Sequence, residues 1–107
     1  MAADFKQVID EMKGKGIETA LVKREGGLVY STFGMEDPAP YVSQYLANNA
    51  QLLMAELGDE AKEIEITFPD RFLVLIPLDS YILVALVKTR EDKKVLRGYV
   101  DSIKSMF

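Results

Sequence analysis

Hydrophobic residues recur at two different spacings along the chain, and together these spacings predict eight elements. Phe5, Val8, Ile9 and Met12 fall at the spacing of one helix face. Later segments either alternate polar and apolar residues or are rich in β-branched and aromatic residues, as strands are. The predicted order is αββαβββα, with helices over residues 3–13, 40–58 and 91–106 and strands over 17–24, 28–33, 62–68, 71–78 and 81–89.

Two of these strands predict how the elements form layers. Residues 72–76 and 81–87 are almost wholly apolar, so both faces of each strand should be covered. Short turns join the last three strands, which predicts an antiparallel meander. We therefore predict an α+β fold, a three-layer α/β/α sandwich around a five-stranded antiparallel sheet. Strands 28–33 and 62–68 are expected at its edges.

The glycine pair Gly26-Gly27 follows an apolar run and raises the question of a phosphate-binding loop. Such a loop needs a helix directly after it, with a Lys-Ser or Lys-Thr pair. Here the residues after the pair are Leu28-Val29-Tyr30, which read as a strand, and no such lysine follows. The pair instead fits a hairpin turn, in which glycine supplies a positive φ.

Composition limits the chemistry that the chain can perform. The 107 residues suit one domain over residues 1–107, and they include no cysteine and no histidine. Thiol chemistry, histidine-based catalysis and most metal sites are thereby removed, and we expect no cofactor. The net charge of −4 argues against nucleic acid as a partner. No apolar run is long enough for a membrane span, so we expect a soluble, cytoplasmic protein.

Charged residues offer few candidate sites. Glu63 and Glu65 point the same way from one strand and could form a carboxylate pair. The simpler interpretation is a charged edge strand that discourages aggregation. Arg71, Arg90 and Arg97 could each reach toward a bound nucleotidase, but surface arginines rarely do so. No catalytic residue is predicted.

The helix over residues 40–58 is the most informative element. One set of apolar residues should face the sheet, and a second stripe of Tyr41, Tyr45 and Leu52 lies about 130° away at 100° per residue. Glu56 is the only charged residue between positions 38 and 58. Scarce charge with exposed tyrosine is typical of an interface core, so we predict a protein contact on the second stripe. The predicted sheet-facing set is Val42, Leu46, Ala50, Leu53, Met54 and Leu57.

The element order, the hairpin ALVKREGGLVYSTFG and the meander FLVLIPLDSYILVALV resemble the Roadblock/dynein light chain family. The entry GIETALV to the first strand is similar as well. The resemblance covers nearly the whole chain. It implies a profilin-like fold and a dimer in which the second helix and third strand of each subunit pair. It maps the contact onto Tyr41, Tyr45, Asn48, Asn49 and Leu52 of the helix and Glu63, Ile64, Glu65, Ile66, Thr67 and Phe68 of the strand.

That contact raises an electrostatic question. If the strand over residues 62–68 pairs with its own copy, Glu63 and Glu65 come near their two-fold mates, which is unfavourable. Lys62 could offset the repulsion, or the register could keep the glutamates apart.

The resemblance also implies a function. Family members are non-catalytic scaffolds that bind or regulate small Ras-like GTPases, or link cargo to motors. We therefore expect a homodimeric adaptor, or a heterodimer with a paralogous subunit, that binds a small GTPase. The expected partner platform is Gln44, Asn48, Gln51 and Ala55. The alternative is a module that senses a small molecule between sheet and helix, for which Thr19 and Thr67 are the only polar candidates. An enzyme comes third.

Overall fold

A computed structural model of the chain describes residues 2–25, 27–33, 39–59, 62–78 and 80–105, with the backbone alone for residues 2–4 and 39–44. The element order is αββαβββα, as predicted. Most strands are shorter than their apolar patterns, because the outer residues of each pattern enter turns. The elements are α1 (Ala2–Gly14), β1 (Glu18–Lys23), β2 (Leu28–Ser31), α2 (Ala39–Glu56), β3 (Ile64–Thr67), β4 (Phe72–Pro77), β5 (Tyr81–Val87) and α3 (Arg90–Lys104).

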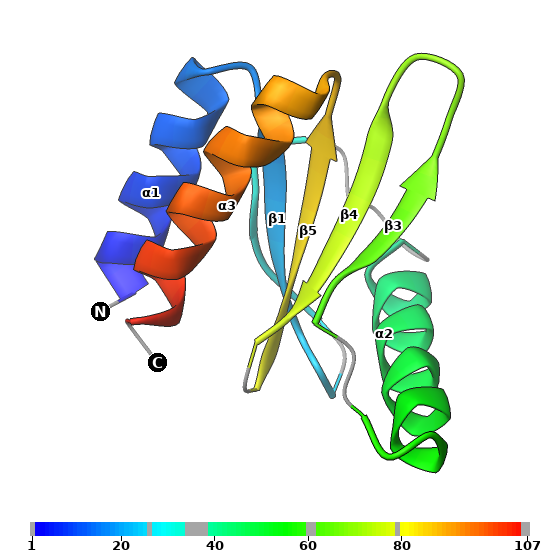
Figure 1. Cartoon of the computed structure of the whole chain (residues 1–107). Coiled ribbons are helices and arrows are strands. Elements are labelled where there is room, and N and C mark those ends of the chain that lie inside the picture. The colour runs from blue at the N-terminus through cyan, green and yellow to red at the C-terminus, as the bar shows by residue number, and fades with distance from the viewer. Residues whose placement is uncertain (1, 26, 34–38, 60–61, 79, 106–107) are drawn as a thin grey trace.

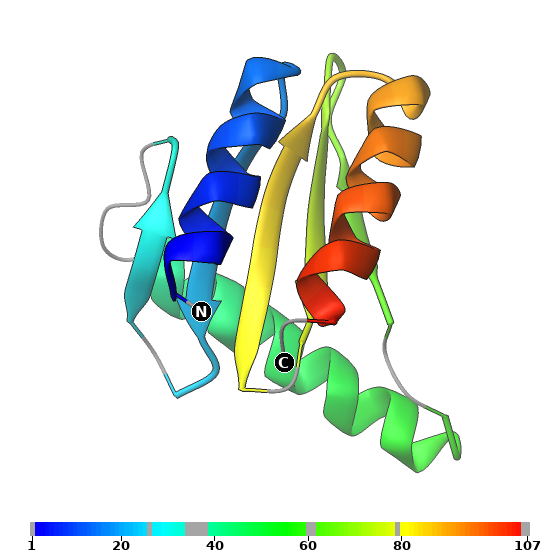
Figure 2. The same cartoon turned by 90° about the vertical axis from the view of Figure 1, so that its left-hand side faces the viewer.

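The five strands form one antiparallel sheet in the order β2-β1-β5-β4-β3. The strands β2 and β3 lie at the edges, as predicted, and β5 is central. The helices α1 and α3 cover one face of the sheet, while α2 crosses the other face alone (Figures 1 and 2). The predicted three-layer sandwich is therefore confirmed, with two helices in one outer layer and one helix in the other.

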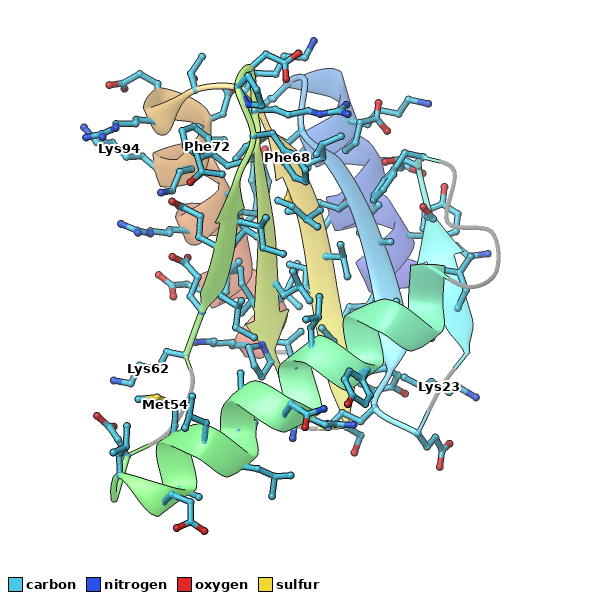
Figure 3. All side chains as sticks on the ribbon, turned by 90° about the vertical axis from the view of Figure 1, so that its right-hand side faces the viewer. Lys23, Met54, Lys62, Phe68, Phe72 and Lys94 are labelled. Carbon is cyan, nitrogen blue, oxygen red and sulfur yellow. The ribbon has the colours of Figure 1, made fainter. Side chains whose placement is uncertain are left out.

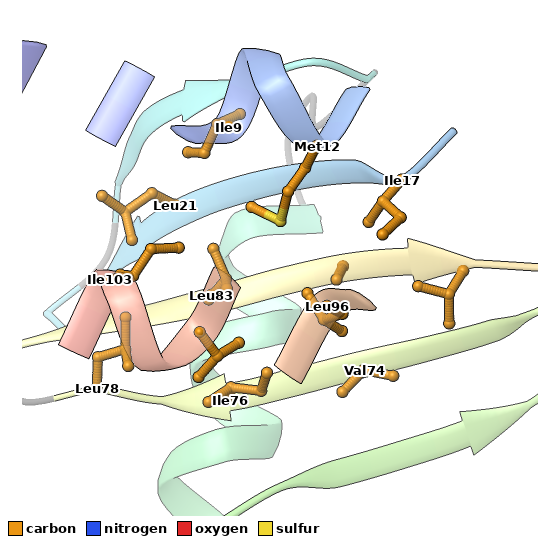
Figure 4. Packing of buried hydrophobic residues seen from close by; sticks show 13 residues of the cluster. Ile9, Met12, Ile17, Leu21, Val74, Ile76, Leu78, Leu83, Leu96 and Ile103 are labelled. Carbon is orange, nitrogen blue, oxygen red and sulfur yellow. The ribbon is translucent and has the colours of Figure 1, made fainter. Parts of the chain in front are cut away.

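The core is divided by the sheet into two clusters of unequal size. Thirteen buried residues lie between the sheet and the α1–α3 layer, including Ile9, Leu83, Leu96 and Ile103 (Figure 4). Of the buried residues with described side chains, six lie on the α2 side, and α2 supplies Ala47 to them. Alternate residues of β4 and β5 enter opposite clusters, which explains why these strands are apolar on both faces. Within residues 45–56 of α2, whose side chains are described, only Ala47 is thus fully buried.

The β1–β2 connection confirms the turn interpretation of the glycine pair. The backbone N–H of Lys23 donates to the carbonyl of Gly27 at 2.9 Å, and Gly27 has a φ of 112°. The strand β2 follows at once and pairs with β1, with an irregularity between Leu21 and Val22. Gly26 lies outside the described residues. The backbone here closes a hairpin and does not lead into a helix N-terminus.

The third helix is fixed at its start by a cap and along its length by burial. Thr89 accepts a hydrogen bond from the N–H of Asp92 at 3.1 Å, which satisfies a free donor of the first turn. Leu96, Val100 and Ile103 are buried against the sheet, as the apolar spacing predicts. None of the helices in the described ranges is long and apolar enough to cross a membrane.

Candidate interaction surface

The second helix turns a different side to the sheet from the one predicted. Leu53 and Leu57, expected to pack on the sheet, are 62% and 71% exposed, and Leu46 is 37% exposed. Among the α2 side chains that the structure describes, residues 45–56, Ala47 is the most completely buried, at 1% exposed. The predicted packing of Leu46, Leu53 and Leu57 on the sheet is therefore wrong.

The error has a physical cause in the size of the residues. Ala47 and Ala50 allow the helix backbone to lie close to the sheet, whereas the sequence pattern gave most weight to the large leucines. Half-buried Met54 and Gln51 continue the same side of the helix. Leu46, Leu53 and Leu57 form a stripe, the leucine flank. At 100° per residue, this flank lies roughly 90° around the helix from the side that contacts the sheet. The leucines thus point sideways, off the sheet.

The leucine flank faces the edge of the sheet that β3 forms. A groove of about 550 Å³ runs between α2 and the start of β3, and Leu53 and Ile64 line opposite sides of it. Figure 3 shows α2 crossing the sheet obliquely, with Met54 near Lys62 at the β3 side. The other residues that line the groove are Ala50, Asp59 and Glu63. An apolar helix flank therefore lies next to the open edge of β3.

The edge strand β3 separates its apolar and charged residues cleanly. Ile64 packs on the α2-side cluster, so Ile64 and Ile66 share the α2 face of the sheet. Glu65 points to the opposite face, where its carboxylate forms an ion pair with Lys93 of α3. Glu63 also reaches α3, with 3.6 Å between its Oε2 and Nη2 of Arg97. The counter-ions of both glutamates thus come from α3 and not from Lys62.

The backbone of β3 offers hydrogen-bonding groups at the open edge. Ile64 to Thr67 pair with Leu75 to Phe72 of β4, and the N–H of Phe68 donates to the carbonyl of Arg71 at 2.9 Å. Because hydrogen-bonded positions alternate in an antiparallel pair, Ile64 and Ile66 bond to β4. The N–H and C=O groups of Glu65 and Thr67 then face outward, where another strand could pair with them.

The predicted contact residues of α2 occupy several environments. Tyr45 and Leu52 are 69% and 67% exposed on the surface that faces away from the sheet. The Asn48 amide donates to the Arg24 carbonyl at 3.4 Å, and that of Asn49 to the Tyr45 carbonyl at 2.7 Å.

Among the predicted platform residues, Asn48 and Gln51 are half-buried and Ala55 is exposed. Gln44, and Tyr41 of the predicted contact, have side chains outside the described residues. At the α2 surface, the large exposed side chains outside the predicted contact are Leu46, Leu53 and Leu57.

The candidate ligand and catalytic groups do not converge. Thr19 is fully buried in β1, whereas Thr67 is exposed on β3, with β5 and β4 between them. The two threonines therefore do not line one pocket. Arg71, Arg90 and Arg97 are exposed, and Arg97 pairs with Glu63. Among the described residues, no group of three or more acidic side chains could hold a metal ion.

Two tyrosines on the α1–α3 face have altered acidity. The hydroxyl of Tyr30 donates to the Asp10 carboxylate at 2.7 Å, and this bond, with desolvation, raises the pKa of Tyr30. Desolvation raises the pKa of Tyr99, and the Glu11 carboxylate adds to the effect. The protonated phenol is therefore favoured at both tyrosines, where α1 meets β2 and α3.

No protein-family model matches the sequence, and no curated protein matches it. Solved structures do match. MglB of Myxococcus xanthus is 14% identical, covers 94% of this chain and 92% of its own, and has a TM-score of 0.80.

An MglB structure with a tetrameric arrangement is 15% identical, with coverages of 92% and 84% and a TM-score of 0.75. A Roadblock/LC7 domain from Streptomyces avermitilis is 10% identical over 94% of both chains, with a TM-score of 0.74. The chain therefore has the Roadblock/LC7 fold, as its resemblance to that family predicts.

Proposed function

We propose that this chain is a non-catalytic homodimeric adaptor that binds or regulates a small Ras-like GTPase in the cytoplasm. The observation that carries the proposal is the exposed leucine flank of α2 beside the open edge of β3. The family resemblance supplies the class of partner, and the fold that the chain shares with MglB and the Roadblock/LC7 domain supports it.

The first part of the proposal is the dimer. Leu53 and Leu57 expose most of their side chains, and Phe68 at the end of β3 is 41% exposed. Large apolar side chains exposed beside an open strand edge are typical of a protein contact. A second copy that pairs along β3 would bring the two leucine flanks together and complete the hydrogen bonds of Glu65 and Thr67. The tetrameric arrangement of one MglB structure supports assembly in proteins of this fold.

The second part of the proposal is the surface for the GTPase. In such a dimer the outward stripes of the two α2 helices, with Tyr45 and Leu52, lie on one face. Glu56, at the border of this surface, is the only charged residue of α2, so the surface carries little charge. Exposed tyrosine and leucine with little charge suit a contact of moderate affinity. A GTPase that docks through its switch loops would bind in one nucleotide state more tightly than in the other.

Sedimentation equilibrium tests the dimer. We expect a dimer at micromolar concentration and a monomer for Leu53→Asp, because a buried unpaired carboxylate costs on the order of several kcal/mol. The matched control is Val95→Asp, at an apolar residue of α3 that is 38% exposed on the other face. A monomeric wild type at 100 μM would refute the dimer.

The partner is tested separately. Small GTPases captured from the native host are purified, loaded with GDP or a non-hydrolysable GTP analogue, and titrated into the protein. We expect saturable binding that depends on the nucleotide. Equal or absent binding in both states would contradict the GTPase assignment and leave the dimer standing.

A further inference from the structure

The open edge of β3 restricts how two copies can pair, and this inference rests on the dimer proposed above. A two-fold axis that makes two identical strands antiparallel is perpendicular to the sheet. It therefore keeps α2 of both copies on the same face. Residues that oppose each other must then share a face, so Glu65 opposes an odd-numbered residue and Ile66 an even-numbered one.

Three registers of β3, centred on Ile64, Glu65 or Ile66, differ in where the charges fall. A pair centred on Ile64 sets Glu63 against Glu65 of the second copy, twice. A pair centred on Glu65 sets that carboxylate against its own copy. A pair centred on Ile66 sets Glu65 against Thr67, so no glutamate directly faces a glutamate. Like charges directly opposite destabilise a strand pair.

The apolar face of β3 also favours the register centred on Ile66. Centring on Ile66 places Ile66 against its copy and Ile64 against Phe68, whose ring is 41% exposed in the single chain. Centring on Glu65 would instead place Phe68 level with Lys62. In the Ile66 register Lys62 is level with Asp70 of the second copy, so opposite charges meet at the ends of the strands.

We propose that two copies of the chain pair along β3 in the register centred on Ile66, and that Glu65 determines this register. Lys93 and Arg97 hold the carboxylates of Glu65 and Glu63 on the α3 face. The charges thus stay clear of the apolar face, where the two α2 helices meet. Moving the centre of the pair to Glu65 or to Ile64 brings glutamates into opposition, so the charges act against these two registers.

Disulfide trapping tests the register directly, because the chain has no cysteine of its own. Directly opposed residues of a non-hydrogen-bonded pair have Cα atoms about 4.5 Å apart, within the reach of a disulfide. Two variants suffice, Ile64→Cys and Ile66→Cys, each oxidised alone and then as a mixture after subunit exchange. One variant carries a longer tag, so that the mixed product is separated by size.

Each register gives a different result. Ile66→Cys alone should cross-link, whereas Ile64→Cys alone and the mixed product should not, because those residues are then too far from each other. Cross-linking of Ile64→Cys alone, or of the mixture alone, would overturn the proposed register. Absence of every product from a protein that sediments as a dimer would overturn it too. If the reduced variants and the wild type sediment as monomers, the dimer itself fails, and the register fails with it.

The role of Glu65 has its own test. Glu65→Gln keeps the shape of the side chain and removes the charge. When it is added to each cysteine variant, the cross-link between Ile64→Cys and Ile66→Cys subunits should form in addition to the cross-link between two Ile66→Cys subunits. An unchanged cross-linking pattern would show that the apolar residues alone set the register and would overturn the part assigned to Glu65.

Discussion

Lys93 of α3 lies between the Glu65 carboxylate of β3 and the ring of Phe72 of β4. Its ammonium group pairs with the carboxylate and is 5.2 Å from the ring centroid. One cation thereby joins the capped end of α3 to the edge strand and to its neighbour. The side chains of Lys93 and Glu65 are 19% and 30% exposed, so solvent screens the pair only in part.

Lys93→Ala should therefore lower stability measurably. Exposed ion pairs contribute about 0.2–1 kcal/mol and a cation–π contact about 0.5–1 kcal/mol, so we expect a loss of roughly 1 kcal/mol. Urea unfolding of a variant kept monomeric by Leu53→Asp measures it without interference from assembly. The control is Lys94→Ala, whose partner Glu91 is on the same helix and well exposed. Equal effects of the two substitutions would show that the β3 contact contributes nothing.

Ala47 is expected to be the residue of α2 that tolerates enlargement least. It is 1% exposed and lies where the helix backbone approaches the sheet. Ala47→Leu inserts three carbon atoms into a filled space, which typically costs about 1–3 kcal/mol. The control is Ala55→Leu, on the exposed side of the same helix, where we expect a change within about 0.5 kcal/mol. Thermal unfolding that ranks the two variants in the reverse order would contradict the observed orientation of α2.

The orientation of α2 also marks where sequence reasoning was reliable and where it was not. Apolar runs such as those of β4 and β5 predict burial on both faces, and the layers followed from them. On α2, either the side with the large residues or the side with the small residues could pack against the sheet. Ala47 carries little weight in a hydrophobic pattern, yet its size lets the helix approach closely. Burial against a partner and burial against the sheet look alike in sequence, so the pattern predicted the leucines on the sheet, where the structure leaves them exposed.

The counter-ions of the two β3 glutamates could not be predicted from the sequence either. Glu63 and Glu65 alternate with isoleucines, which predicts their common face. Their pairing with Arg97 and Lys93 depends on the path of α3 across the sheet, about thirty residues later in the chain. The lysine nearest in sequence, Lys62, was the only one that the pattern could suggest.

Stability should fall in alkaline solution through Tyr30. Its folded pKa is raised above the ordinary value of 10.0, mainly by its hydrogen bond to Asp10. The folded state thus holds the phenol proton longer than the unfolded state does. The contribution is complete below the unfolded pKa and is lost as the pH rises through the folded pKa. Urea unfolding from pH 8 to 11 should show a shallower decline for Tyr30→Phe than for Tyr45→Phe, an exposed tyrosine of α2. Identical slopes would rule out this role.

Nucleotides should not bind to the chain by itself. The turn at Gly27 leads into β2, so its backbone N–H groups are not followed by a helix N-terminus that could face phosphate. Calorimetric titration with GTP or ATP should therefore give no saturable heat. Binding at tens of micromolar would show that the hairpin holds phosphate by another arrangement.

The α2 surface proposed to bind a GTPase should be separable by mutation from the surface proposed to form the dimer. Tyr45 and Leu52 face away from the sheet. Around the helix, Asn49 and Glu56 lie between these two residues and the leucine flank. We therefore expect Tyr45→Lys with Leu52→Lys to leave the dimer intact and to weaken capture of the GTPase at least tenfold, because two exposed apolar anchors are lost. Equal capture by the variant and the wild type would move the binding surface to the α1–α3 face.

The platform first predicted from the sequence makes a useful comparison. Asn48 donates to the Arg24 carbonyl and Gln51 is half-buried, so their replacement by lysine disturbs the packing of α2 as well as its surface. Asn48→Lys with Gln51→Lys should lower the melting temperature, whereas the Tyr45 and Leu52 pair should not. If both double variants lose the partner but only the Asn48 and Gln51 pair is destabilised, direct contact is distinguished from loss of structure. A melting temperature unchanged in both would show that the Asn48 amide is free to face a partner.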